Sequence, residues 1–125
     1  MKYIIAGGRD FNNRNVLYRI LNENRYSKNI TEIVSGCARG ADTLGAEWAD
    51  VYGLRLARFP AEWDKYGKSA GFIRNTEMGE YADAAIIFWD GASKGTKHMI
   101  QTMKKLGKPY YVYNYSGELI GANGN

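Results

Sequence analysis

The chain has 125 residues, of which 45% are hydrophobic and 24% charged, the composition of one ordinary globular domain. Its single cysteine, Cys37, and single histidine, His98, exclude an internal disulfide, a multi-cysteine zinc site and a histidine-rich metal site. The net charge of +4 suits an anionic ligand such as a phosphate ester but falls short of the basic surface of a dedicated nucleic-acid binder.

Five apolar runs have the length of β-strands: residues 3–6, 32–35, 54–59, 84–89 and 110–113. Helix-like stretches lie between them, at residues 15–24, 41–52, 70–82 and 96–106. Because a parallel crossover needs a long connection, this alternation predicts a Rossmann-like α/β three-layer sandwich with a mainly parallel five-stranded sheet.

The same pattern bounds the domain and its location. We expect one domain over residues 1–120 and a flexible tail at 121–125, which is rich in glycine and asparagine. No apolar run approaches the about 20 residues of a membrane span. Met1 is followed by a strand-length apolar segment without a signal cleavage pattern. We therefore expect a cytoplasmic protein without a membrane partner.

Ligands of open α/β sheets bind beyond the carboxyl ends of the strands, so the loops after the apolar runs are the candidate site. The first loop is Gly7-Gly8-Arg9-Asp10, where the glycines permit close backbone approach and Arg9 offers a bidentate fork for phosphate. The alternative is a tight turn with a solvated Arg-Asp pair.

The second loop is built from small residues and enters a helix whose first amides are free to hold an anion. Its candidate ligand-binding residues are Ser35, Gly36, Arg39, Gly40 and Asp42. Ser35 and Asp42 also fit a purely structural role as a helix cap and a first-turn carboxylate.

Two further loops complete the candidate site. After the third strand come Trp63, Arg74 and Asn75, which alternatively are a packing aromatic and surface residues. After the fourth strand come Asp90, Gly91, Ser93, Gly95 and Thr96, in an order typical of a phosphate cradle. This last loop lacks the Gly-Lys-Ser/Thr ending of a Walker loop. The chain also lacks the Gly-x-Gly-x-x-Gly fingerprint, which disfavours NAD.

Together these loops resemble the YspA/YpsA-related branch of the SLOG superfamily, which also contains the lonely-guy phosphoribohydrolases and the DNA-processing protein DprA. The motifs are Gly7-Gly8-Arg9-Asp10-Phe11, the loop from Ser35 to Asp42, the segment from Trp63 to Met78, and Gly95-Thr96. The resemblance implies a Rossmann-like domain that binds nucleotides or their derivatives, with Gly36 and Gly95-Thr96 holding phosphate or ribose. It also implies a homo-oligomer. We expect no cofactor.

The resemblance to the lonely-guy enzymes is incomplete at the reacting groups. Arg74 and Met78 match their Arg-Lys-x-x-Met motif, with Asn75 in place of the lysine. In their second motif, Met99 stands where a catalytic glutamate is expected. Cleavage of a glycosidic bond needs carboxylates near the anomeric carbon, so Asp42 or Asp90 would have to serve as the catalytic group.

Three functions follow from these residues. We expect a protein that recognises, senses or sequesters a nucleotide-derived small molecule. The first alternative is an N-glycosidase or phosphoribohydrolase that acts on nucleoside monophosphates. The second alternative is a DNA-binding module, because the Ser-Gly-x-Ala-x-Gly-x-Asp loop also resembles that of DprA. The modest net charge speaks against nucleic acid as the partner.

Overall fold

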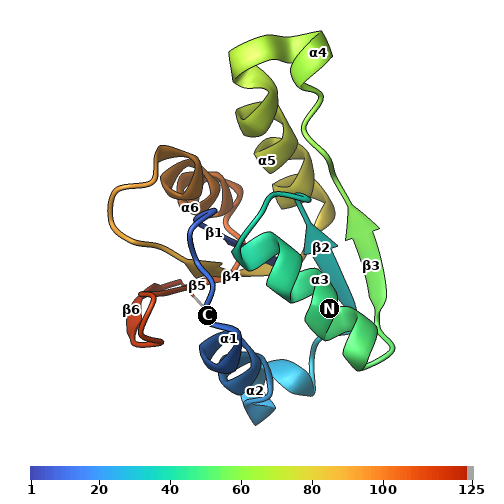
Figure 1. Cartoon of the computed structure of the whole chain (residues 1–125), viewed down its shortest axis with the longest axis vertical. Coiled ribbons are helices and arrows are strands. Elements are labelled where there is room, and N and C mark those ends of the chain that lie inside the picture. Colours follow the sequence, from blue (N-terminus) through green and yellow to red (C-terminus); the bar gives the residue numbers. More distant parts are fainter. Residues whose placement is uncertain (124–125) are drawn as a thin grey trace.

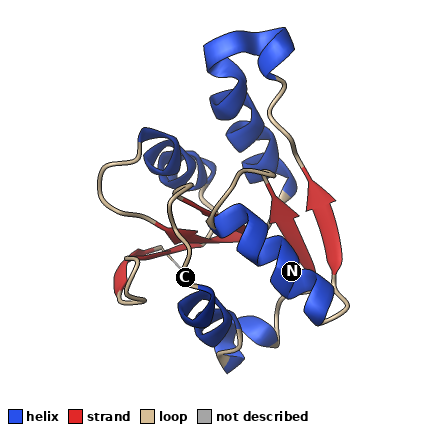
Figure 2. Cartoon of the chain, in the orientation of Figure 1, coloured by secondary structure: helices blue, strands red, loops and turns tan. Residues whose placement is uncertain are grey.

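A computed structural model describes residues 1–123 as one six-stranded sheet with helices on both faces (Figures 1 and 2). The elements are, in chain order, β1 (Lys2–Gly7), α1 (Arg14–Leu21), α2 (Asn24–Ser27), β2 (Glu32–Ser35), α3 (Ala41–Val51), β3 (Arg55–Arg58), α4 (Trp63–Tyr66), the 3-10 helix η1 (Gly67–Ser69), α5 (Ala70–Tyr81), β4 (Ala84–Phe88), α6 (Lys94–Leu106), β5 (Tyr110–Tyr113) and β6 (Leu119–Ala122). The sheet order is β3-β2-β1-β4-β5-β6. The predicted α/β class is confirmed, with six strands rather than five.

The sheet has an apolar core on each face because side chains along a strand alternate between the two faces. Ile5 and Ile33 point into the core covered by α1, α2 and α3. Ile4 and Ile87 point into the core covered by α5 and α6. Every residue of β4 is buried, as expected for a strand between two others in a sheet that is covered on both faces.

The strand order places a switch point between β1 and β4. From β1 the chain moves outward through β2 to β3, and it then returns to β4 on the other side of β1, with all these pairings parallel. Ligands of open α/β sheets bind at such a point, outside the carboxyl ends of the strands. Helix α4 and the start of α5 stand beyond the arrowheads of β2 and β3 (Figure 1).

The first predicted helix, residues 15–24, corresponds to α1, which ends earlier, and a second short helix, α2, begins at Asn24. The side chain of Asn13 caps the start of α1 by accepting a hydrogen bond from the Val16 amide at 3.2 Å. Helix α1 ends at Leu21, and Glu23 adopts an extended conformation. The break turns the chain so that Tyr26 of α2 enters the core, where its hydroxyl lies 2.6 Å from that of Tyr113. A single continuous helix would not deliver Tyr26 to this place.

The sixth strand, β6, was not predicted. It pairs antiparallel with β5 through a turn that begins at Asn114. The side chain of Asn114 accepts hydrogen bonds from the amides of Ser116 at 3.0 Å and Glu118 at 2.9 Å, and Gly117 takes the left-handed conformation. The tail predicted at 121–125 therefore starts too early, because residues 121 and 122 belong to β6. Residues 124 and 125 of that tail lie outside the described residues.

The fourth long helix, α6, begins at Lys94 rather than at the predicted residue 96. Ser93 caps it, because its hydroxyl accepts a hydrogen bond from the Thr96 amide at 3.3 Å. At the other end Gly107 adopts the left-handed conformation typical of a helix C-terminus. Lys108 then donates to the carbonyl oxygens of Gly79 and Ala82, at 2.8 Å each, where α5 ends. Within residues 1–123 no helix is long and apolar enough to span a membrane.

Candidate functional site

A cavity of about 450 Å³ lies at the switch point, beyond the carboxyl ends of β1 and β4 and between α5 and α6. A site of this volume is large enough for a small molecule. The cavity is lined by Ala6, Gly7, Gly8, Arg9, Asp10, Ala38, Asp42, Trp63, Lys68, Gly71, Phe72, Arg74, Asn75, Met78, Ser93, Gly95, Thr96 and Met99. We call it the larger lobe.

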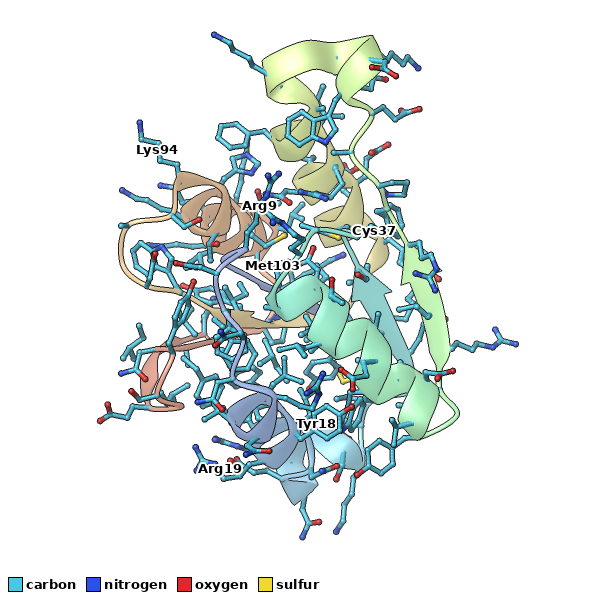
Figure 3. All side chains as sticks on the ribbon, in the orientation of Figure 1. Arg9, Tyr18, Arg19, Cys37, Lys94 and Met103 are labelled. Carbon is cyan, nitrogen blue, oxygen red and sulfur yellow. The ribbon has the colours of Figure 1, made fainter. Side chains whose placement is uncertain are left out.

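A second cavity of about 270 Å³ adjoins the first, on the side of the β2–α3 loop and the connection from β3 to α4. We call it the smaller lobe. It is lined by Arg9, Gly36, Cys37, Ala38, Arg39, Pro60, Ala61, Trp63 and Arg74. Figure 3 shows Arg9 and Cys37 above the amino end of α3, on the side that faces α5. Arg9, Ala38, Trp63 and Arg74 line both cavities, so the two lobes are direct neighbours.

The first loop needs its glycines for packing within the protein. A Cβ atom on Gly7 would lie 2.5 Å from the carbonyl oxygen of Phe88, and one on Gly8 would collide with the hydroxyl of Tyr115. Tyr115 lies in the β5–β6 turn and donates a hydrogen bond to Asp10 at 2.6 Å. The unpredicted hairpin therefore holds this loop in place and orients Asp10, which leaves Arg9 exposed at the cavity.

The second loop brings a buried carboxyl group to the site. Asp42 lies in the first turn of α3 with only 4% of its surface exposed. Burial raises the pKa of Asp42 to about 6, although nearby Arg74 and the amides of Ala38 and Gly36 act in the opposite direction. Ser35 is a structural residue of the loop: its hydroxyl donates to the carbonyl of Asp42 at 3.3 Å and accepts from the amide of Cys37 at 3.2 Å.

Arg74 of α5 ties this loop to the helices. Its guanidinium donates to the carbonyl oxygen of Gly36 and, at 3.1 Å, to the side chain of Asn75. A Cβ atom on Gly36 would lie 2.6 Å from the guanidinium and 2.7 Å from the carboxylate of Asp42, so only glycine leaves room for both. Burial lowers the pKa of Arg74 despite the attraction of Asp42. For both groups, the free-energy cost of leaving water therefore exceeds the gain from their mutual attraction.

The fourth strand delivers the amino end of α6 to the larger lobe. Ser93, Gly95 and Thr96 line this lobe. The Thr96 amide is capped by Ser93, which leaves the amides of Lys94 and Gly95 at the helix start to favour an anion there. Buried Asn75 fixes this end of α6, because its amide donates to the carbonyl of Gly95 at 3.2 Å. Asp90, by contrast, is exposed and accepts from the amides of Ala92 and Ser93 at 2.8 Å each, so it closes its own loop.

Aromatic side chains form the outer wall of the site. Trp63 is 50% exposed and Phe72 is 47% exposed, and both line the larger lobe. The ring of Phe72 stacks on His98 with the centroids 4.1 Å apart and an interplanar angle of 5°. Burial lowers the pKa of His98, which favours the neutral form of its ring. Exposed aromatic faces of this kind offer stacking surfaces for a planar ligand.

The structure brings most of the residues predicted for the site together. The larger lobe is lined by Gly7, Gly8, Arg9, Asp10, Asp42, Trp63, Arg74, Asn75, Ser93, Gly95 and Thr96. Gly36 and Arg39 line the smaller lobe. Ser35, Gly40, Asp90 and Gly91 line neither lobe. Of the two proposed catalytic carboxyl groups, only Asp42 is therefore at the site.

The sequence interpretation missed several lining residues on α5 and α6. Gly71 and Met78 share a face of α5 with Asn75, at the four- and three-residue spacing of a helix, so that spacing could have identified them. Lys68 lines the lobe from η1, just before α5. Met99 lies three residues after Thr96 and also lines the larger lobe. The methionine at the position expected for a lonely-guy glutamate thus faces the cavity.

Comparison with known proteins identifies the family. The profile of the YspA, cpYpsA-related SLOG family matches residues 1–66. The chain is also 34% identical over 117 residues to the gene 61 protein of Mycobacterium phage D29, in an alignment that covers 86% of this chain and 92% of that protein. No solved structure matches the chain. The chain belongs to the YspA, cpYpsA-related SLOG family.

Proposed function

We propose that this protein binds a nucleotide or nucleotide-derived small molecule in the larger lobe, to recognise, sense or sequester it. Membership of the family suggests nucleotide-related binding or glycosidase-type chemistry. The observation that carries our choice is the lining of the larger lobe: a helix N-terminus, an arginine and exposed aromatic rings meet at the switch point of the sheet. These groups complement a phosphate, a ribose phosphate and a base, respectively.

The lining also favours binding over hydrolysis. Met99 lies in the lobe at the position where the lonely-guy resemblance expects a glutamate. A thioether carries no charge and cannot stabilise the oxocarbenium-like centre of glycosidic cleavage. Asp90 faces away from the lobe into its own loop. Two carboxyl groups do line the lobe, those of Asp42 and Asp10, but Asp10 already accepts a hydrogen bond from Tyr115 at 2.6 Å.

Position 95 gives the sharpest test of this proposal. The space around a Cβ atom on Gly95 is open, so a larger side chain fits there without a clash. Gly95→Asp adds a negative charge in the first turn of α6, which favours the helix but repels a phosphate. Gly95→Asn has nearly the same shape without the charge. We expect Gly95→Asp to weaken nucleotide binding about tenfold or more, and Gly95→Asn to retain it.

The measurement is calorimetric titration of both variants and the wild type with a panel of nucleoside monophosphates, nucleoside diphosphates and ADP-ribose. Thermal unfolding should show both variants folded. Equal affinities of the two variants would contradict phosphate binding at α6, and no binding of any compound by the wild type would contradict the proposed function.

N-glycosidase activity on nucleoside monophosphates is the second candidate function, and Asp42 is the observation that favours it. A carboxyl group whose pKa is about 6 holds a proton for part of the time near neutral pH and can pass it to a leaving base. Release of free base from a monophosphate, abolished by Asp42→Asn, would support this candidate. No release by the wild type across the four common bases would rule it out for them.

A homo-oligomer is also a proposal, which rests on the family resemblance. Light scattering coupled to size-exclusion chromatography measures the mass directly. A mass of 14.1 kDa, that of one chain, would contradict it.

A further inference from the structure

We infer that the smaller lobe is a second anion-binding subsite, so that the ligand is a nucleotide with two linked phosphate groups, such as a nucleoside diphosphate or its sugar ester. This inference rests on the proposed function and adds the ligand class. One phosphate lies at the amino end of α6, and the other lies among Arg9, Arg39 and Arg74.

The charge of the smaller lobe is the first support. Its lining includes three arginines, which come from the loop after β1, the loop after β2 and helix α5. Among the described residues that line this lobe there is no aspartate or glutamate. Three arginines on one cavity wall present a fork geometry that matches phosphate oxygens.

Two of the three arginines, Arg9 and Arg39, are also available to a ligand. Over residues 1–123, the side chains of Arg9 and Arg39 make no hydrogen bond and no ion pair within 4.0 Å. Arg74 is anchored by Gly36 and Asn75, and the positive charge of Arg9 lowers its pKa further. Like charges held together at a cavity are stabilised by an anion placed between them.

The two lobes offer different groups to the two linked phosphates. The lobes meet at Arg9, Ala38, Trp63 and Arg74, with the end of α6 on one side and Arg39 on the other. Ser93 and Thr96 line only the larger lobe, whereas Arg39 lines only the smaller. When a monophosphate binds in the larger lobe, no phosphate group of the ligand occupies the smaller lobe. A diphosphate that extends past these shared residues occupies both lobes.

Arg39 provides the test because it is exposed and lines the smaller lobe alone. Calorimetric titrations compare AMP, ADP, ADP-ribose and inorganic pyrophosphate on the wild type, on Arg39→Ala and on Arg58→Ala. Arg58 is an exposed arginine of β3 that lines neither lobe, so it controls for net charge. We expect ADP and ADP-ribose to bind the wild type about tenfold more tightly than AMP. Arg39→Ala should remove this preference, while Arg58→Ala should keep it.

Each outcome has a distinct meaning. Equal affinities of the wild type for AMP, ADP and ADP-ribose would overturn the second subsite but leave the proposed function standing. An equal loss of affinity for all three compounds in Arg39→Ala would do the same. If no nucleotide binds but pyrophosphate binds through Arg39, the anion subsite stands and the nucleotide proposal fails. If none of the four binds, both fail. Arg39-dependent, salt-sensitive binding of single-stranded DNA in place of the diphosphates would overturn the small-molecule assignment.

Discussion

Replacing Asp42 by asparagine should stabilise the protein at neutral and alkaline pH. The carboxyl group is almost fully buried at the start of α3, and burial raises its pKa from 3.8 to about 6. The folded carboxyl group keeps its proton up to about pH 6. Loss of that proton at higher pH therefore lowers the free energy of unfolding. Strongly perturbed carboxyl groups gather at functional sites, where stability is given up for binding or chemistry.

The size of the effect follows from the pKa. At about 1.4 kcal/mol per pKa unit, the shift from 3.8 to about 6 corresponds to about 3 kcal/mol. Between these pH values the folded state binds a proton that the unfolded state has released. The free energy of unfolding therefore falls as the pH rises, by about 2 kcal/mol between about pH 4.5 and pH 8. An asparagine amide does not titrate, but it mismatches one backbone donor of the loop, at a cost of about 1 kcal/mol.

Urea unfolding at a series of pH values measures this difference. We expect Asp42→Asn to match the wild type near pH 4.5 and to exceed it by about 2 kcal/mol near pH 8. Asp50→Asn, at an exposed position on the same helix, is the matched control and should follow the wild type at every pH. A constant difference between Asp42→Asn and the wild type from pH 4.5 to pH 8 would refute a raised pKa for this carboxyl group.

Two further variants test the packing around the site. Gly36→Ala places a methyl group 2.6 Å from the Arg74 guanidinium, so the arginine must leave the Gly36 carbonyl. Calorimetry should show an affinity loss of about tenfold for any nucleotide that binds the wild type, and an unchanged affinity would contradict the role of Arg74. Gly79→Val puts a side chain within 2.9 Å of Thr102, where α5 crosses α6. Denaturant unfolding should show a loss of about 1–3 kcal/mol, whereas an unaltered midpoint would refute the close crossing.

Much of the fold could be predicted because the apolar runs are continuous where strands are buried on both faces. The prediction for residues 32–35 coincides with β2, and the run at 84–89 differs from β4 by one residue. The sixth strand was missed because its apolar residues Leu119 and Ile120 are exposed on an edge, so no buried run marks them. The turn that begins at Asn114 is what leads the chain into this strand. Its hydrogen bonds are visible only in the folded structure.

The candidate site was predictable in outline for a topological reason. Loops that follow parallel strands meet at one edge of the sheet, which brings Arg9, Asp42 and Thr96 together. Which carboxyl group faces the cavity was not predictable. Asp42 and Asp90 both follow strands. Asp90 accepts hydrogen bonds within its own loop and so points away from the cavity, whereas Asp42 is buried beside Arg74 at the cavity. That distinction depends on contacts between residues far apart in the sequence.

The central claim is that a nucleotide binds at the carboxyl ends of β1 and β4. Amide chemical shifts of the isotope-labelled protein, followed during titration with AMP and with ADP-ribose, test it most directly because they report both binding and place. We expect the largest changes in residues 7–10, 74–75 and 93–97. Changes centred elsewhere on the sheet, or none with either compound, would contradict it.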